Sequence, residues 1–507
     1  MLITDNPNTT VSKEQLTAAS GKFSYKELLW AVVAVWVIGM FSALICFDTF
    51  KVGSAPVNIE YAKSCCIGYG FVAIIALLST RLILGRLWSR PACIIISCLT
   101  ALMLVGVSVN MAGYLSQPGS TWAYPGLDMW TDAGSRYLSA MYLWEGWPLS
   151  DRPSFGYQLF LLFCFNIFGR GVLVPILFNV LCTSVSAALM GCICHRLCPG
   201  GDVRRRAWVA VLLFAIIPSV TFFSTILQRE AIIICGVSLF TLILTDIYRG
   251  RLQAGSLAAA AVGAFMLFPT RHMIGYLLLA LILICFIYSY CRHTGSLSGR
   301  YNSTLAALLF CFAIIAGGNA VNSNGDTTLL NTDKAAQNTQ SMMGHETVRK
   351  YAESTDNYYA QSPIHRLIYL PMAAVAQYFP PFPWNYTRDK VLGAFVPFAR
   401  LSILWYITGG LILAYYALCI YRRRAAGGLR VWAALWPFCY LGVAYMSAGT
   451  VARYALPFLP LAIPLALQTI ISVRHGAVSI KNVKIYVVAY AIAVAAVLIF
   501  AYNRLKM

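Results

Sequence analysis

The sequence predicts an all-α polytopic membrane protein, because it is far too apolar for a soluble domain of its length. Of its 507 residues, 59% are hydrophobic and only 11% are charged, and the mean hydropathy is +0.69. Apolar runs of roughly 17–25 residues recur along the chain, which is the length that crosses ~30 Å of hydrocarbon as a helix. The chain is therefore treated as one integral-membrane domain over residues 1–507.

The apolar runs define about thirteen predicted spans. The first 26 residues are polar and lack the charged start, apolar core and cleavage site of a signal peptide, so the first span is expected to stay as an anchor. In order, the predicted spans are 28–48, 66–83, 91–112, 171–195, 206–225, 230–248, 253–269, 272–290, 303–321, 398–420, 430–448, 452–473 and 484–502.

Clusters of Lys and Arg predict the orientation, because short loops rich in these residues stay in the cytoplasm. All the clusters can lie on one side of the membrane only if the stretch "FGYQLFLLFCFNIFG", residues 155–169, does not cross the bilayer. It is short for a span and is expected to lie in the outer interface. The N-terminus is then cytoplasmic, two large loops at 113–170 and 322–397 face outward, and the protein belongs in the cytoplasmic (inner) membrane. The clusters are Arg86/Arg90, Arg196/Arg204/Arg205/Arg206, Arg249/Arg251, Arg292/Arg300, Arg422/Arg423/Arg424 and Arg474/Lys481/Lys484.

The net charge of +20 predicts no nucleic-acid partner. In a membrane protein such an excess mostly marks the cytoplasmic loops. The polar stretch 322–362 has too few apolar residues to build its own core and is read as a solvated loop.

The first outer loop concentrates carboxylates among aromatic residues in "DMWTDAGSRYLSAMYLWEGWPLSDRP", residues 128–153. Acidic residues are common in any wet loop, which is a sufficient account of Glu145 and Asp151. Asp132 differs, because "DAGSRYLSAMYLWEG" predicts an amphipathic helix with Asp132 near its first turn. Such a helix lying on the membrane would hold that carboxylate at the bilayer edge. Its apolar face is expected to comprise Tyr137, Ala140, Met141 and Trp144.

This passage resembles the first outer loop of the GT-C membrane glycosyltransferases, which include the protein O-mannosyltransferases and the lipid A aminoarabinose transferases. "GTVARYALPFLPL" at 449–461 is similar to a motif that ends many such enzymes, and "QYFPPFPW" at 377–384 resembles a Pro-Trp stretch before their later spans. The resemblance implies that Asp132 is the catalytic carboxylate. The residues that carry it are Asp132, Tyr137, Ala140, Leu143, Gly146, Pro148, Pro153, Phe168 and Gly169.

Two departures from the family pattern affect this assignment. More than one predicted span precedes the acidic loop where the family usually has one, and Ala133 follows Asp132 in place of a frequent second acidic residue. Asp128, four residues upstream, could supply that second carboxylate from the same helical face.

The resemblance implies transfer of a sugar, hexosyl or pentosyl, from a polyprenyl-phosphate donor to a hydroxyl of a lipid, glycan or protein at the outer face of the membrane. Such a reaction needs a base for the acceptor hydroxyl and cations for the departing phosphate. The expected cations are Arg229, Arg271 with His272, and Arg453, because positive residues are disfavoured on the outer side unless an anionic ligand recruits them.

Three further residues are assigned on less specific grounds. Glu230 is either the ion-pair partner of Arg229 or a second active-site acid. Tyr137 is expected to contact substrate, and Trp384 either anchors at the headgroup level or stacks on a sugar face.

The alternatives come from other functional classes. An O-antigen-type polymerase or ligase would use Arg and His of the second outer loop, and a lipid or sugar transporter would need paired repeats and interrupted helices. No cofactor is required by the expected chemistry. Asp128, Asp132 and Glu230 could together ligate one divalent cation, although their spacing does not favour a stable site.

Overall fold

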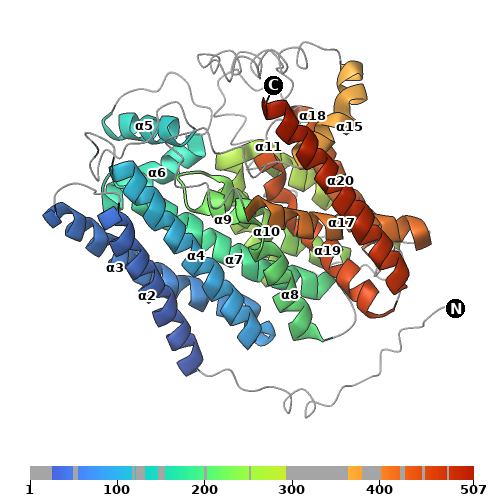
Figure 1. The fold of residues 1–507 in the computed structure, drawn as a ribbon, viewed down its shortest axis with the longest axis horizontal. Helices are drawn as coiled ribbons and strands as arrows, with labels where there is room; N and C mark the ends of the chain where they lie inside the picture. The colour runs from blue at the N-terminus through green and yellow to red at the C-terminus, as the bar shows by residue number, and fades with distance from the viewer. Residues whose placement is uncertain are drawn as a thin grey trace.

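A computed structural model describes residues 25–49, 55–116, 120, 132–146, 155–198, 202–249, 253–292, 363–378, 401–422, 429–447, 452–476 and 479–506 (Figure 1). Every regular element in these ranges is a helix. Eight of the described helices are long and apolar enough to cross a membrane, or nine if one bent pair counts as a span. The predicted class of an all-α polytopic membrane protein is confirmed, while the number of about thirteen spans stays a prediction.

Six long helices coincide with predicted spans. Ser89 caps the third of them, since its Oγ accepts a hydrogen bond from Ala92 N at 3.4 Å, and Pro91 occupies the first turn, where no amide donor is needed. The six are α2 (Tyr25–Thr49), α3 (Ala55–Leu84), α4 (Arg90–Leu115), α7 (Leu173–Leu197), α10 (Glu230–Tyr248) and α20 (Ile480–Lys506).

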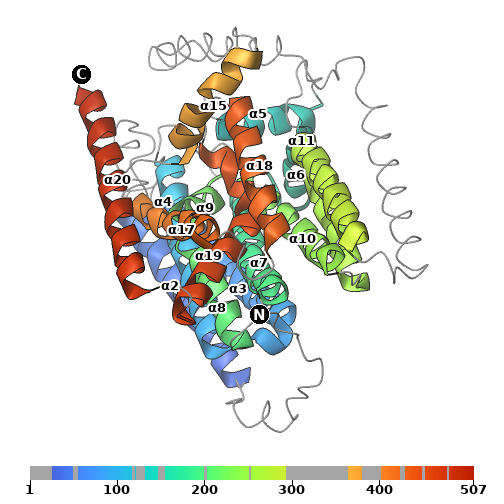
Figure 2. The same cartoon turned by 90° about the vertical axis from the view of Figure 1, so that its right-hand side faces the viewer.

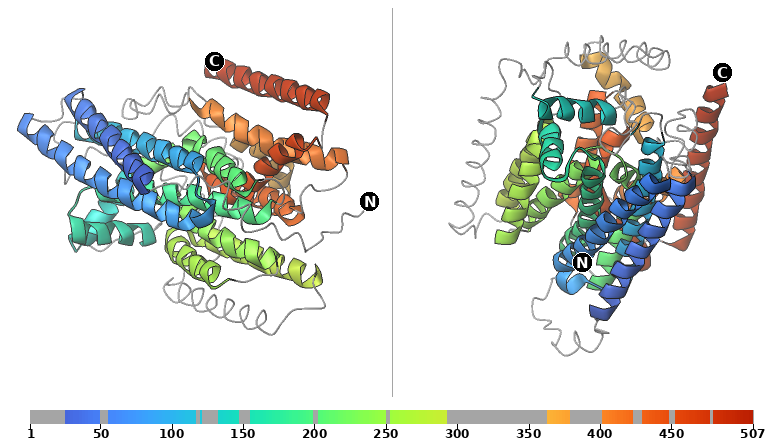
Figure 3. Two further views of the ribbon diagram at one scale, coloured as in Figure 1. Left: turned by 90° about the horizontal axis from the view of Figure 1, so that it is seen from below. Right: turned by 90° about the vertical axis from the view of Figure 1, so that its left-hand side faces the viewer.

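Helices α7 and α10 form the centre of the bundle, and α20 lies at its margin (Figures 2 and 3). The buried share of the apolar window is 94% in α10 and 78% in α7, but only 6% in α20. Because all three are similarly apolar, the difference reflects position: α20 presents most of its surface outward, where lipid would be its solvent. On the other flank, α2 packs against α3 and α4.

The predicted span 206–225 is wrong as a single helix. The structure divides it into α8 (Val203–Ala215) and α9 (Pro218–Ser224), which meet at 68°. Pro218 is the physical reason: its ring disfavours helical backbone at the preceding residue, and Ile217 accordingly has φ −82° and ψ 106°.

The predicted spans 253–269 and 272–290 fall within one element, α11 (Ala254–Arg292), that is broken where the two predictions meet. Arg271 has φ −156° and ψ 77°, which interrupts the helix two residues after Pro269. The first part of α11 packs along α10.

Three amphipathic or short helices lie at one end of the bundle, α5 (Asp132–Trp144) and α6 (Phe155–Phe168) on one side of it and α15 (Pro363–Tyr378) on the other (Figures 1 and 2). We call this the α5 end. With 14 residues, α6 is shorter than a span, as the sequence predicted. Of the expected apolar face of α5, Tyr137, Ala140 and Met141 are buried and Trp144 is 38% exposed. Because α5 packs on α6, this face contacts protein.

The predicted spans 398–420 and 452–473 begin as 3-10 turns before becoming α-helical. The elements are η3 (Leu401–Leu404), α17 (Trp405–Arg422), α18 (Arg430–Ser447), η5 (Ala452–Phe458) and α19 (Leu459–Arg474). The predicted span 303–321 lies outside the described residues.

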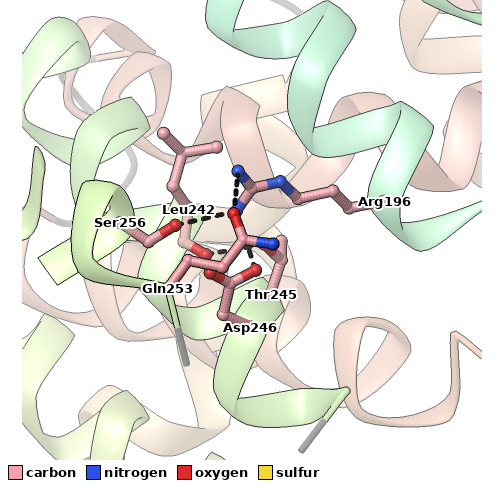
Figure 4. Close-up of polar contacts among 6 residues, drawn as sticks. All are labelled: Arg196, Leu242, Thr245, Asp246, Gln253 and Ser256. Atoms are coloured by element: carbon pink, nitrogen blue, oxygen red, sulfur yellow. Dashed lines mark hydrogen bonds and ion pairs between the residues drawn. The ribbon is translucent and has the colours of Figure 1, made fainter. Parts of the chain in front are cut away.

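At the opposite end of the bundle, a polar cluster joins α7, α10 and the start of α11 (Figure 4). We call this the Arg196 end. Arg196 Nη1 lies 2.7 Å from Asp246 Oδ1 and 2.9 Å from Ser256 Oγ, and Nη2 lies 3.5 Å from Gln253 Oε1. At the same end, Arg204 Nε donates to the carbonyl of Arg86 at 3.4 Å. Two of the arginine clusters that predicted the orientation, Arg86/Arg90 and Arg196/Arg204/Arg205/Arg206, therefore share one end.

Candidate functional site

A non-helical turn, residues 225–229, lies buried at the α5 end between α9 and α10. Backbone donors reach two of its carbonyls: Ile233 N of α10 donates to Arg229 O at 3.0 Å, and Gln228 N donates to Ile226 O at 2.8 Å. Side chains from neighbouring helices supply further donors. Asn110 Nδ2 of α4 donates to Thr225 O at 2.7 Å. Asn179 Nδ2 of α7 donates to Ile226 O at 3.0 Å and to Gln228 O at 2.8 Å. Two amides inside apolar spans thus fix the backbone of this turn.

The turn receives a buried arginine from α5. Arg136 is 8% exposed, and its Nη1 donates to Gln228 Oε1 at 2.7 Å. The same guanidinium lies 5.9 Å from the ring centroid of Tyr157 on α6. Arg136 therefore joins the interfacial helix α5 to the interior of the bundle.

A second buried arginine links the turn to the break in α11. Arg229 is 8% exposed, and its Nη1 donates to Thr270 O at 3.1 Å, directly before Arg271. Helix α6 reaches the same break, because Gly156 packs so closely on Pro269 that any Cβ at this position would overlap with its side chain and backbone. The break, the turn and the start of α6 thus form one packed unit.

Glu230 begins α10 immediately after Arg229, and its side chain is only 2% exposed. A carboxylate in the first turn of a helix is favoured by the positive end of the helix dipole. Two neighbouring residues therefore place a buried cation and a buried anion at one point of the α5 end.

Tyr157 is fully buried between these charges. Burial raises the pKa of its hydroxyl, the positive charge of Arg136 lowers it, the negative charge of Glu230 raises it, and a hydrogen bond with the Asn179 side chain lowers it. The hydroxyl is thus within electrostatic reach of a cation, an anion and an amide at once.

The described side chains give this site an excess of positive charge. Around the turn and the break in α11, the described residues supply three guanidinium groups, those of Arg136, Arg229 and the half-buried Arg271, and one carboxylate, that of Glu230, an excess of two positive charges. Such an excess away from water favours an anionic ligand, and planar guanidinium groups match phosphate oxygens in geometry.

The structure brings together three of the predicted site residues: Arg229, Glu230 and Arg271. Asp132 begins α5 one helical turn before Arg136, so the two positions share a face of the helix. The side chain of Asp132 lies outside the described part of the chain. So do the side chains of His272, within α11, and Arg453, within η5, and the whole of Asp128 and Trp384.

Tyr137, predicted to contact substrate, is 3% exposed. Its hydroxyl donates to Arg170 O at 2.9 Å, and its ring meets Phe165 edge-on at 5.4 Å between centroids. These contacts dock α5 on α6.

Sequence reasoning missed Arg136, Gln228, Asn110 and Asn179. Arg136 stands four residues before Ala140 and so lies on the apolar face of α5, where a cation needs a buried partner. The two asparagines are amides within apolar runs, which in membrane helices mark interhelical hydrogen bonds. These signals could have identified all of them except Gln228.

No group of three or more His, Cys, Asp or Glu side chains within the described ranges is arranged to hold a metal ion. Of the three carboxylates considered for a cation, only the Glu230 side chain is described.

Comparison with known proteins adds no assignment: no family model matches the chain, and neither a curated protein nor a solved structure does.

Proposed function

We propose that this protein is a membrane glycosyltransferase that moves a sugar from a polyprenyl-phosphate donor to a hydroxyl acceptor. The observation that carries the proposal is the buried site at the α5 end, where Arg136, Arg229 and Arg271 exceed the charge of Glu230 beside the helix that begins at Asp132. A lipid-linked sugar phosphate offers a complementary anion to such a site.

In the proposed reaction, the acceptor oxygen forms a bond to the anomeric carbon while the bond from that carbon to the phosphate oxygen breaks. The acceptor proton passes to a carboxylate, for which Asp132 is the first candidate and Glu230 the second. The electron pair leaves with the polyprenyl phosphate, whose charge grows as the bond breaks. Arg136 and Arg229 would stabilise that charge within a dry environment.

We further propose that the α5 end faces away from the cytoplasm of the inner membrane. The support is the arginine-rich Arg196 end, since short loops rich in Arg remain on the cytoplasmic side. The amphipathic character of α5 and α15 suits a headgroup region, where a donor lipid would present its phosphate.

The test is transfer from radiolabelled polyprenyl-phosphate sugars, hexosyl and pentosyl, in membranes that contain equal amounts of each variant. Asp132→Asn keeps the size of the side chain but loses its basicity, so turnover should fall by ~10²–10⁴. Arg229→Ala and Arg136→Gln should raise the KM for the donor more than that for the acceptor, and Arg229→Lys should recover only part of the loss.

Arg90→Ala is the matched control, because Arg90 is exposed and pairs with Glu27 away from the site. Full activity in Asp132→Asn would contradict the mechanism as written. A defect confined to the arginines and to the 322–397 loop would favour the polymerase or ligase alternative.

A carrier is the second candidate, because the bent pair α8–α9 and the buried turn after it form an interrupted helix of the kind that lines transport sites. Uptake of the lipid-linked sugar into sealed vesicles without transfer to any acceptor would establish the carrier and exclude the transferase.

A further inference from the structure

Three arginines meet at the Arg196 end, far from the site described above. Arg86 belongs to the short turn η1 (Gly85–Leu87) between α3 and α4, and Arg204 and Arg205 lie in the first turn of α8. Arg204 Nε donates to Arg86 O at 3.4 Å, a contact between residues 118 positions apart. Arg86 and Arg205 are exposed, and Arg204 is half-buried. Folding therefore collects these three cations at one place on the surface.

The described carboxylates do not balance this charge. The acidic neighbour is Asp202, whose Oδ1 accepts a hydrogen bond from Arg204 N at 3.0 Å and caps α8. Within the described ranges, the side chains of Arg86 and Arg205 have neither a hydrogen bond nor an ion pair. One carboxylate thus stands against three guanidinium groups, which can bind the oxygens of a phosphate.

An apolar surface begins at these arginines and continues along the outside of the bundle. On α8, Trp208 and Leu212 follow Arg205 at intervals of three and four residues, so all three lie on one side of the helix. Leu212 is exposed and Trp208 is half-buried. Helix α4 packs against α8, begins at the same end and exposes Ile94 and Leu102 (Figure 1). The apolar side of α8 extends about 10 Å from Arg205, far enough to reach from a headgroup into the acyl chains.

Arginine alone at this end would signal only orientation, because cytoplasmic ends of spans are commonly rich in it. Arg90 is an example: it is exposed at the start of α4 and forms an ion pair with Glu27 of α2. The cluster of Arg86, Arg204 and Arg205 differs in two respects. A tertiary contact assembles it, and it adjoins an apolar surface with a tryptophan. This combination fits an amphipathic anion, with a phosphate head and hydrocarbon chains.

We propose that Arg86, Arg204 and Arg205 form a headgroup site for an anionic phospholipid, whose acyl chains lie along α8 and α4. The guanidinium groups bind the phosphate, Trp208 lies at the level of the headgroup, and Leu212 contacts a chain. Basic clusters beside membrane helices bind anionic lipids in this way. The proposal is independent of the proposed function, because it concerns the opposite end of the bundle.

The experiment measures lipid binding to the purified full chain in detergent by native mass spectrometry. The two probes are phosphatidylglycerol and phosphatidylcholine with identical dioleoyl chains, so that only the net charge of the headgroup differs. The wild type should bind phosphatidylglycerol more tightly. Arg86→Gln and Arg205→Gln should each weaken its binding by about 5-fold, the effect of one arginine at an anionic lipid surface, and leave phosphatidylcholine unchanged. Arg205→Lys should retain part of the preference, because it keeps the charge and loses the planar fork.

Arg90→Gln is the matched control, because it removes the same charge from the same end of the bundle at a residue that is already paired. It should change phosphatidylglycerol binding by less than about 2-fold, since a screened surface charge outside the site acts only weakly. Equal losses in Arg90→Gln and Arg205→Gln would show that the general positive field, and no local site, attracts the lipid.

Two further outcomes would overturn the proposal. Equal binding of the two lipids by the wild type would mean that the headgroup charge is not recognised. Displacement of phosphatidylglycerol by millimolar inorganic phosphate would assign the arginines to a free anion. The melting temperature of each variant is measured in parallel, and Arg86→Gln decides if Arg205→Gln proves unstable.

Discussion

The turn at 225–229 provides the most direct test of how the site is held. Asn179→Leu keeps the approximate volume of the side chain but removes both hydrogen bonds to the turn, at 3.0 Å to Ile226 O and 2.8 Å to Gln228 O. Side-chain hydrogen bonds between membrane helices average about 0.6 kcal/mol, because helices in the unfolded state find other partners. Each buried carbonyl that loses its donor can cost about 1–3 kcal/mol.

Ile226 O keeps a second donor, the backbone N of Gln228 at 2.8 Å, so the carbonyl left without its donor is that of Gln228. These values therefore predict that Asn179→Leu lowers the free energy of unfolding by about 1–4 kcal/mol. The assay is unfolding in mixed micelles titrated with SDS, followed by the helical signal and by tryptophan fluorescence. Asn166→Leu on α6 is the matched control, because Asn166 is exposed and should tolerate leucine. If Asn179→Leu were as stable as Asn166→Leu, the claim that interhelical amides hold the turn would be refuted.

Three further predictions concern packing, charge and orientation. Gly156→Ala should lower the free energy of unfolding by about 1–3 kcal/mol, because the added Cβ would overlap with Pro269. Gly113 on α4 faces open space, so Gly113→Ala should be neutral or slightly stabilising in the same SDS titration. Arg196→Met should cost about 3–5 kcal/mol because Asp246, with a side chain 3% exposed, loses its partner at 2.7 Å. Arg90→Met should cost far less, because it removes an exposed pair, and equal losses would show that burial does not decide the difference. With native cysteines blocked or replaced, Ser120→Cys and Ala335→Cys should react with an impermeant maleimide in intact cells, and labelling only after permeabilisation would reverse the proposed orientation.

The sequence predicted most of the described helices, because a helix that spans the bilayer needs an apolar run of matching length, and such runs can be found in the sequence directly. Helix α10 begins at Glu230 and ends at Tyr248, where the apolar run begins and ends. The break between α8 and α9 was missed, since hydropathy does not distinguish a straight span from a bent one. Pro218 was the available signal, but a proline in a membrane helix often kinks the helix without ending it.

The site was predictable only in part, for a related reason. Arg229, Glu230 and Arg271 stand out as charges at the ends of apolar runs, whereas Arg136 is marked only by its place on the apolar face of α5, which does not reveal its partner. Its burial depends on Gln228, which is 92 residues away in the sequence and meets it at 2.7 Å. Tertiary contacts of this range are set by how the helices pack, and no local pattern encodes them.

The capped turn also has a consequence for the order of biosynthesis. Its hydrogen-bond donors lie in α4 and α7, both of which precede residues 225–229 in the chain. Because synthesis proceeds from the N-terminus, both asparagines have left the ribosome before the turn emerges. An irregular segment with unsatisfied carbonyls would resist transfer into hydrocarbon on its own. The earlier helices can therefore serve as an internal template that receives the turn as it is made, so that insertion and assembly of this part of the bundle become a single event.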